Sequence, residues 1–324
     1  MKAISPSDRI FIAGHKGLVG SAIVANLSHR GYRNLLVRTR AELDLCDQAA
    51  TFHFLATEKP DVVFVAAAKV GGIVANDKYR ADFIHENLAI NHNVIWAAHT
   101  SNVRRLVFLS SSCAYPRKCP QPISEASLLT GSLEPTNQPY AVAKIAGMEL
   151  VNSLRRQHGR DYFTVMPTNL YGPGDNFHPD NSHVIPALIR RFMEAKSRGE
   201  TEVVVWGTGT PRREFMFAAD CADAVVHLTE VIDQDFFSSK GYNAPGFSHI
   251  NIGTGVDLSI SELAALIAAR TGYKGAIRFD PSKPDGTPVK RLDTTLLART
   301  GWRPSTTLES GIEQTIAWLA KAHR

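Results

Sequence analysis

The chain alternates short apolar runs with longer segments whose apolar residues recur at helical spacing. The first apolar run, RIFIA at 9–13, leads through a glycine turn into the helical segment SAIVANLSHRG. Buried strands that alternate with helices are typical of a parallel sheet with right-handed crossovers. We therefore predict an α/β fold with a Rossmann-type, doubly wound parallel sheet. Its predicted strands are 9–13, 34–39, 62–68, 105–110 and 162–166, and its predicted helices include 48–58, 81–100 and 138–157.

After Pro173 the pattern changes. Residues 175–181 are polar and loop-like, and a proline-rich loop is predicted at 281–288. Between and beyond these loops, strands and helices continue to alternate, which predicts a second, smaller α/β unit. Its predicted strands are 202–206, 249–252 and 276–279, and its predicted helices are 184–196, 259–271 and 308–322, whereas the predicted helix 217–231 packs back on the first unit.

Composition and charge exclude several classes of protein. The net charge of +5 is dispersed, without a run of five or six basic residues, which argues against a nucleic-acid-binding tail. No apolar run reaches the roughly 18 residues that a membrane span needs, and the N-terminal stretch is too short for a signal peptide. No two cysteines form a Cys-x-x-Cys pair, so we expect neither a disulfide framework nor a metal site. We expect a soluble, cytoplasmic protein without a membrane or nucleic-acid partner.

The glycine turn after the first strand has the spacing Gly14-x-x-Gly17-x-x-Gly20. A strand, a glycine turn and a helix in this order form the context of a dinucleotide-binding fingerprint. Gly14 permits the tight turn, Gly17 lets the backbone approach a pyrophosphate, and Gly20 lets the helix pack on the strand. The alternative is a glycine turn without a ligand. We predict nucleotide binding by the whole turn, whose members are Gly14, His15, Lys16, Gly17, Leu18, Val19 and Gly20.

The end of the second predicted strand selects the cofactor. An acidic residue at this position would bind the ribose 2′-hydroxyl of NAD, but this chain has Arg38-Thr39-Arg40, with Lys16 in the glycine turn. Cations at this position favour a 2′-phosphate, so we predict NADP(H), with Arg40 as a contact. A solvated basic turn is the alternative. Asp44 and Leu45 follow where an adenine ring would lie.

A candidate catalytic pair lies at the start of the predicted helix 138–157. Tyr140 and Lys144 are four residues apart and therefore share one face of that helix. An ammonium near a phenol favours the phenolate and should lower its pKa, and such a tyrosine can give a proton to a carbonyl oxygen that is being reduced. The alternative is an unrelated surface pair. The fourth strand ends in Ser110-Ser111-Ser112-Cys113, which places hydroxyls and a thiol at the ligand-binding edge of the sheet.

These motifs together resemble the extended short-chain dehydrogenase/reductase family. The residues that carry the resemblance are the glycine turn, the serine-rich strand end, Tyr140-x-x-x-Lys144 and PTNLYGP at 167–173. Longer stretches resemble the members of that family that convert GDP-4-keto-6-deoxy-D-mannose to GDP-L-fucose with NADPH, by epimerisation at C3 and C5 and reduction of the C4 ketone. These stretches are AAAKVGGIVAN at 66–76, SSSCAYP at 110–116, EPTNQPYAVAKIAG at 134–147, MPTNLYGPGDNFHPDNSHVIPALIRRF at 166–192 and SKPDGTPVK at 282–290.

The resemblance covers essentially the whole chain and implies specific roles. It implies that Ser111, Tyr140 and Lys144 stabilise charge on the C4 oxygen, with Cys113 as base and His183 as acid. Further cofactor contacts are expected at Asp44, Leu45, Lys144, Pro167, Asn169, Leu170 and His183. Substrate contacts are expected at Arg191, Trp206, Arg213, Asp285 and Lys290. Two departures are Lys16, where relatives carry Arg, and Ser110, where a glycine often stands.

The same resemblance divides the chain into an NADP-binding Rossmann domain, 1–172, with 215–253 packing back on it, and a substrate-binding domain, 173–214 and 254–324. It also implies a homodimer that pairs through the helices 81–100 and 138–157. Two alternatives stay open: another NAD(P)-dependent nucleotide-sugar epimerase or dehydratase, and a dinucleotide-binding regulator without catalysis.

Overall fold

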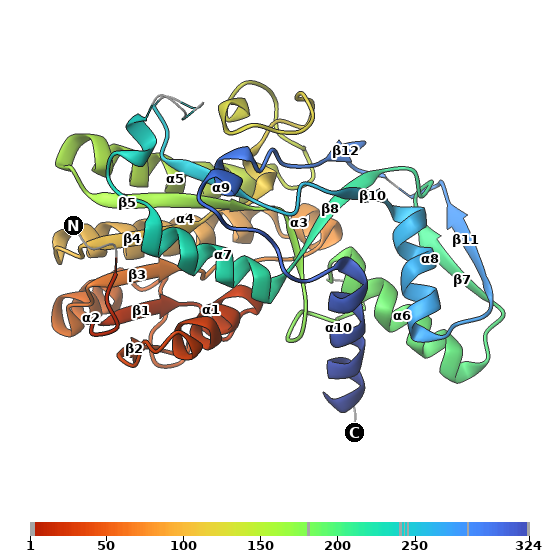
Figure 1. The fold of residues 1–324 in the computed structure, drawn as a ribbon. Helices are drawn as coiled ribbons and strands as arrows, with labels where there is room; N and C mark the ends of the chain where they lie inside the picture. Colours follow the sequence, from red (N-terminus) through yellow and green to blue (C-terminus); the bar gives the residue numbers. More distant parts are fainter. Residues whose placement is uncertain are drawn as a thin grey trace.

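A six-stranded parallel sheet forms the larger half of the molecule (Figure 1). The computed structural model describes residues 4–179, 182–239, 242, 244, 246–283 and 285–322. The strands, in sheet order, are β2 (Leu35–Leu36), β1 (Ile10–Ala13), β3 (Val62–Val65), β4 (Arg105–Leu109), β5 (Asp161–Pro167) and β9 (His249–Ile252). The order reverses between β1 and β3, and ligands of such sheets bind at the carboxyl ends of the strands beside this reversal. The structure thus confirms the predicted doubly wound sheet.

Alternate side chains of each strand enter two separate cores. Val62 and Phe64 of β3 face one layer of helices, and Val63 and Val65 face the other. The first layer is formed by α1 (Leu18–His29) and α7 (Ala218–Val231), and the second by α2 (Gln48–Glu58), α4 (Arg80–Thr100) and α5 (Gln138–His158). Because both faces are covered, all four residues of β3 are buried and read as a continuous apolar run.

The smaller half is organised around β8 (Arg212–Phe217). Its first residues pair with β10 (Asp257–Ser259) and β12 (Val289–Lys290), and its last residues pair with β6 (Asn169–Tyr171). A separate parallel pair is formed by β7 (Glu202–Trp206) and β11 (Ala276–Asp280). The helices of this half are α6 (Val184–Arg198), α8 (Ile260–Thr271) and α10 (Leu308–Ala322), which lie to the right in Figure 1.

Several elements differ from the predictions. The predicted strand 34–39 is reduced to Leu35–Leu36, and Arg38, which lies beyond it, pairs with Glu58. A short helix that was not predicted, α3 (Ile73–Lys78), follows β3. The structure also contains α9 (Thr295–Arg299) and three 3₁₀ helices, η1 (Ser112–Ala114), η2 (Glu125–Ser127) and η3 (Phe236–Ser238).

The C-terminal part of the chain returns to the larger half. Leu296, Leu297 and Trp302 lie in the core that α1 and α7 cover, although the predicted division assigned 254–324 to the smaller half. Trp302 Nε1 donates a hydrogen bond of 2.8 Å to Asp223 on α7. Within the described residues, no helix is long and apolar enough to cross a membrane, and no three His, Cys, Asp or Glu side chains are placed to hold a metal ion.

Candidate active site

In the glycine turn at the carboxyl end of β1, the backbone packs closely against neighbouring backbone segments. Gly14 has a φ of +88°, and a Cβ on it would lie 2.6 Å from the Ala67 nitrogen. A Cβ on Gly20 would overlap the Gly14 carbonyl oxygen. Gly17 is the N-cap of α1 and contributes no side chain, so the first N–H groups of this helix face outward without a side-chain acceptor. The turn therefore fits the pyrophosphate of a dinucleotide.

The two arginines after β2 have different surroundings. Arg38 Nη2 lies 2.9 Å from Glu58, and its guanidinium covers the ring of Phe54 at 5.2 Å. Arg40 is 70% exposed and has only long ion pairs, at 3.4 Å, with Asp44 and Glu86. A 2′-phosphate can therefore displace the partners of Arg40 more readily than the partner of Arg38.

The remaining predicted cofactor contacts follow β2 and β5. The carbonyl of Leu45 accepts a hydrogen bond of 2.9 Å from Asn93, which fixes this turn against α4. Pro167 ends β5, and Asn169 and Leu170 belong to β6. Asn169 Nδ2 donates to the Glu214 carbonyl at 2.8 Å, so this side chain is already held by β8.

The candidate catalytic groups converge where β4 ends. Ser111 caps η1, where its hydroxyl oxygen accepts a hydrogen bond from the Cys113 nitrogen at 3.2 Å. Tyr140 lies in the first turn of α5, and the Ser111 hydroxyl is close enough to lower the pKa of its phenol. Lys144, one turn later, is buried and donates to the Leu109 carbonyl at 2.8 Å. The structure therefore brings together four groups that are spread over 34 positions, from Ser111 to Lys144.

The electrostatics of Tyr140 and Lys144 correct one expectation. Burial raises the pKa of Tyr140, and the nearby Cys113 raises it further, whereas the sequence spacing predicts a lowered value. Burial lowers the pKa of Lys144 to about 7. The spacing shows that the two side chains are neighbours, but it does not show that both are withdrawn from water and that Lys144 is directed to Leu109. Tyr140 is thus a neutral phenol, which is the form that can give a proton to a reduced ketone.

Cys113 lies in a local positive field. Lys290 Nζ donates to its sulfur at 3.4 Å, and Asn137 Nδ2 donates to it at 3.3 Å. Burial raises the pKa of the thiol, but Lys290, Ser111 and Arg213 outweigh burial, and the pKa lies below its ordinary value. Lys290 and Arg213 thus favour the thiolate form of Cys113.

His183 is the N-cap of α6, and its side chain is exposed. The protein atoms around its ring lower its pKa by desolvation, and the Lys290 ammonium lowers it further. Lys290 therefore lowers the pKa of both groups predicted to move protons, Cys113 and His183. It stabilises the charged form of the thiol and destabilises the charged form of the imidazole.

The residues predicted to contact the substrate form a second group beside the candidate catalytic residues. Arg191 covers the ring of Trp206 at 5.1 Å, and that ring is 48% exposed. Arg213 Nη2 donates to the Asp285 carbonyl at 3.4 Å. The Asp285 carboxylate holds the turn after β7, because it accepts from the nitrogen and the hydroxyl of Thr208 at 2.7 and 2.8 Å. Exposed aromatic surface beside guanidinium groups suits a nucleotide diphosphate.

Two residues of the site were not predicted from the sequence. Asn137 contacts the sulfur of Cys113, and only its place before Pro139 and Tyr140 hinted at a role. Glu214 is fully buried, and its carboxylate accepts from the nitrogens of Thr254, Gly255 and Leu292 at 2.6 to 2.8 Å. An acidic residue directly before the apolar run FMFAA was the available signal.

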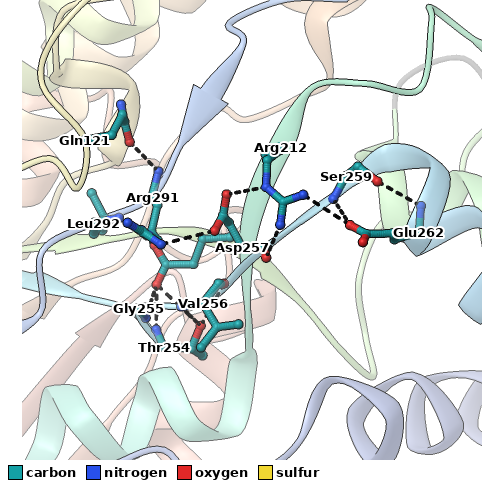
Figure 2. Close-up of polar contacts among 11 residues, drawn as sticks. Gln121, Arg212, Thr254, Gly255, Val256, Asp257, Ser259, Glu262, Arg291 and Leu292 are labelled. Atoms are coloured by element: carbon teal, nitrogen blue, oxygen red, sulfur yellow. Dashed lines mark hydrogen bonds and ion pairs between the residues drawn. The ribbon is translucent and has the colours of Figure 1, made fainter.

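Figure 2 shows how this part of β8 is tied to its neighbours. Arg212 Nε lies 2.9 Å from Asp257 on β10, and Arg291 Nη1 lies 3.4 Å from the same carboxylate. The backbone N–H of Arg291 donates a hydrogen bond of 3.0 Å to the side-chain oxygen of Gln121. These contacts fix the segment that carries Lys290 beside the thiol.

Comparisons with known proteins agree with this site. The family described as "NAD dependent epimerase/dehydratase family" matches residues 10–244. The GDP-L-fucose synthase of Escherichia coli K12 is 56% identical over 96% of both chains. Among solved structures, a GDP-mannoheptose C4 reductase from Campylobacter jejuni with NADP bound is 37% identical, with a TM-score of 0.87 over 98% of this chain and 99% of that one.

A GDP-L-fucose synthetase from Naegleria fowleri bound to NADP is 26% identical, with a TM-score of 0.85 over 99% of this chain and 96% of that one. The glycine turn, the Tyr140–Lys144 pair and these matches have one explanation. This chain belongs to the NAD dependent epimerase/dehydratase family and, within it, to the group of GDP-L-fucose synthases.

Proposed function

We propose that this chain is a bifunctional epimerase and reductase that converts GDP-4-keto-6-deoxy-D-mannose to GDP-L-fucose with NADPH. The observation that carries this proposal is the position of Cys113, whose sulfur lies 3.4 Å from Lys290 Nζ and beside Tyr140. Reduction of a ketone needs a proton donor for the oxygen. An activated thiol beside that donor adds a base, which is what inversion of the neighbouring carbons requires.

The ketone at C4 makes the hydrogens at C3 and C5 acidic. Cys113 removes one of these protons, and the resulting enolate carries its charge on the C4 oxygen. Ser111 and Tyr140 donate hydrogen bonds to that oxygen, and the ammonium of Lys144 adds positive charge. His183 returns a proton from the opposite face, which inverts the carbon.

Reduction uses the same oxyanion site. Bound NADPH supplies the hydride for C4. Tyr140 transfers its proton to the C4 oxygen, for which a neutral phenol with a raised pKa is the required form. Arg191, Trp206, Arg213 and Lys290 would hold the GDP-sugar, and the glycine turn with Arg40 would hold the cofactor.

The direct test is NADPH oxidation in the presence of GDP-4-keto-6-deoxy-D-mannose, with the product identified by NMR. GDP-mannose, which has no ketone, is the control substrate. We expect NADPH consumption with the ketone alone and a product that is inverted at C3 and C5. A product that keeps the C3 and C5 configuration would identify a simple 4-reductase. Binding of NADPH without any consumption would favour the regulator.

The two chemistries can be separated with variants. Cys113→Ser and His183→Gln should abolish deuterium incorporation from solvent at C3 and C5 while leaving NADPH binding intact. Tyr140→Phe should lower the rate of the hydride step by about 100-fold or more, since general acid catalysis contributes about that much. Deuterium incorporation at the wild-type rate in Cys113→Ser or His183→Gln would show that the replaced residue is not the base or the acid.

We also propose a homodimer that pairs through α4 and α5. These helices pack against each other, and each carries a half-exposed apolar side chain, Leu88 on α4 and Val142 on α5. Sedimentation velocity of the wild-type protein and of a Leu88→Arg/Val142→Arg variant tests this: we expect a dimer and a monomer, respectively. A monomeric wild type would reject the pairing.

A further inference from the structure

Asn137 occupies a helix N-cap without capping the helix. Asparagine is favoured at this position because its side-chain oxygen accepts a hydrogen bond from the second or third N–H of the helix. In α5 the side chain makes no such bond. Its Oδ1 is buried without a hydrogen-bond partner, and its Nδ2 instead donates to the sulfur of Cys113 at 3.3 Å.

The sulfur has other charged and polar neighbours. Lys290 on β12 donates to it at 3.4 Å, and Ser111, Arg213 on β8 and Tyr140 on α5 all act on it electrostatically. Arg117 and Glu134, which form an ion pair of 3.1 Å, line the same small cavity. Among these groups the Asn137 amide cannot lose its proton, so it donates to the sulfur at every pH.

A thiolate accepts such hydrogen bonds far better than a thiol does, because bonds to a charged acceptor are roughly twice as strong. The ammonium of Lys290 and the amide of Asn137 therefore favour the same state of the sulfur. Asn137 also lies three residues before Tyr140, so the first turn of α5 carries both a donor to the sulfur and the phenol.

We propose that Asn137 is a further catalytic residue, whose side-chain amide holds the sulfur of Cys113 as a thiolate and in line for proton abstraction. This inference rests on the proposed function, in which Cys113 is the base. It predicts that Asn137 acts through its N–H group, whereas a helix cap would act through its oxygen.

Asn137→Asp separates these two roles. Aspartate is as good an N-cap as asparagine, and its charge suits the helix N-terminus, so a capping role predicts an unchanged or raised melting temperature and, in the uncharged capping variant Asn137→Ser, an unaffected thiol. A donor role predicts that the pKa of the Cys113 thiol rises by about one pH unit or more, because the donor is lost and a negative charge is added. Deuterium exchange at neutral pH should then fall by about 10-fold.

The thiol is measured in the free enzyme, from the pH dependence of its alkylation by iodoacetamide, with the Cys113 peptide followed by mass spectrometry. Asp47→Asn is the matched control, because Asp47 caps α2 with its side chain and lies on another helix. We expect this control to leave the alkylation profile of Cys113 unchanged. If Asn137→Asp does not fold, Asn137→Ser keeps a capping residue but is too short to reach the sulfur, and it should give the same direction of change.

An unchanged alkylation profile in a folded Asn137 variant would overturn the proposal. The proposed function fails in a different way: it fails if Cys113→Ser retains wild-type deuterium exchange. In that case a raised thiol pKa in Asn137→Asp would still support the contact between Asn137 and the sulfur.

Discussion

Lys290 lies between the two groups that are proposed to move protons, and it acts on both. Its ammonium lowers the pKa of the Cys113 thiol, because it stabilises the thiolate, and it lowers the pKa of His183, because it disfavours the imidazolium. The reaction needs a thiolate and an imidazolium in the same molecule. Exchange at C3 and C5 should therefore have a bell-shaped pH profile, whose two apparent pKa values belong to the pair.

Lys290→Met should displace this whole profile to higher pH, by about one unit on each limb. Loss of the ammonium raises the pKa of the thiol and of the imidazole alike, so neither limb should stay in place. The measurement is solvent deuterium exchange at saturating substrate across the pH range. Lys321→Met, which removes an exposed lysine on α10, should leave the profile unchanged. A shift of one limb alone would show that Lys290 acts on only one of the two groups.

Arg40 and Arg38 offer a matched pair for the cofactor. Arg40→Ala should weaken NADPH binding by about 10- to 100-fold, because it removes a charge-assisted contact to the 2′-phosphate, and should leave NADH binding unchanged. Arg38→Ala should change NADPH binding much less, since Arg38 is already paired with Glu58. Fluorescence titration with both cofactors measures the two affinities. Equal losses of NADPH affinity in the two variants would contradict the assignment.

At this scale the sequence indicates which residues are neighbours along one element, but not their surroundings. The spacing of Tyr140 and Lys144 was sufficient to place them together. It could not give the direction of the tyrosine pKa, which depends on burial by other segments. The contact of Asn137 with Cys113 joins residues 24 apart, and that of Lys290 joins residues 177 apart. Such contacts leave no periodic signal.

At the scale of single elements, the packing of α1 on β1 depends on the absence of a side chain at Gly20. A Cβ there would overlap the Gly14 carbonyl oxygen, so the helix must move away from the glycine turn. Gly20→Ala should lower the free energy of unfolding by about 1–3 kcal/mol, the usual cost of overpacking, and should weaken NADPH binding by at least about 10-fold.

Ser21→Ala is the control for this change, because Ser21 is exposed on the next position of α1. Thermal melts and NADPH titration of both variants measure the two effects. Normal NADPH affinity in Gly20→Ala would show that cofactor binding tolerates displacement of the helix. It would contradict the role assigned to Gly20 in the glycine turn.

Elements whose apolar residues form a clear run or period were predictable, and an element that begins with charged residues was not. The boundaries of α2, α10, β7 and β9 match the predicted ranges, because each has enough apolar residues to show its period. The strand β8 was missed, although it is the centre of the smaller sheet. Its first three residues are Arg212, Arg213 and Glu214, whose charges are satisfied by partners elsewhere in the chain.

At the scale of the whole molecule, the chain crosses between the two halves several times. After β8 it enters α7 and β9 of the larger half, returns for β10 and α8, and goes back again for α9. No proline- or glycine-rich linker marks these crossings. This is why the sequence could not show that residues 292–302 pack in the cores of the larger half.

Glu214 joins the halves at one point. Its carboxylate holds Thr254 and Gly255, which precede β10, and also Leu292, two residues after Lys290. Its backbone carbonyl accepts from Asn169 of β6, on the cofactor side. Burial raises the pKa of this carboxyl, although the three backbone N–H groups oppose that effect.

Glu214→Ala should therefore be more damaging than an ordinary loss of a surface carboxylate. It leaves one buried and two partly buried N–H groups without an acceptor. Since each buried N–H costs about 1–3 kcal/mol, the free energy of unfolding should fall by about 3 kcal/mol. Glu262→Ala removes an exposed carboxylate that accepts one N–H in the capping box of α8, and should cost only about 1 kcal/mol.

Measurements of GDP and NADPH binding distinguish whether Glu214 positions the substrate half or only stabilises the fold. Because Glu214 fixes the segment of Lys290 and stands next to Arg213, Glu214→Ala should weaken GDP binding more than NADPH binding when both are measured by calorimetry well below the melting temperature. The glycine turn and Arg40 follow β1 and β2, at the opposite edge of the six-stranded sheet from β9, which leads into Thr254 and Gly255, so the cofactor affinity should fall less. Equal losses of both affinities would mean that the variant is only less stable, and that the carboxylate does not position the substrate half.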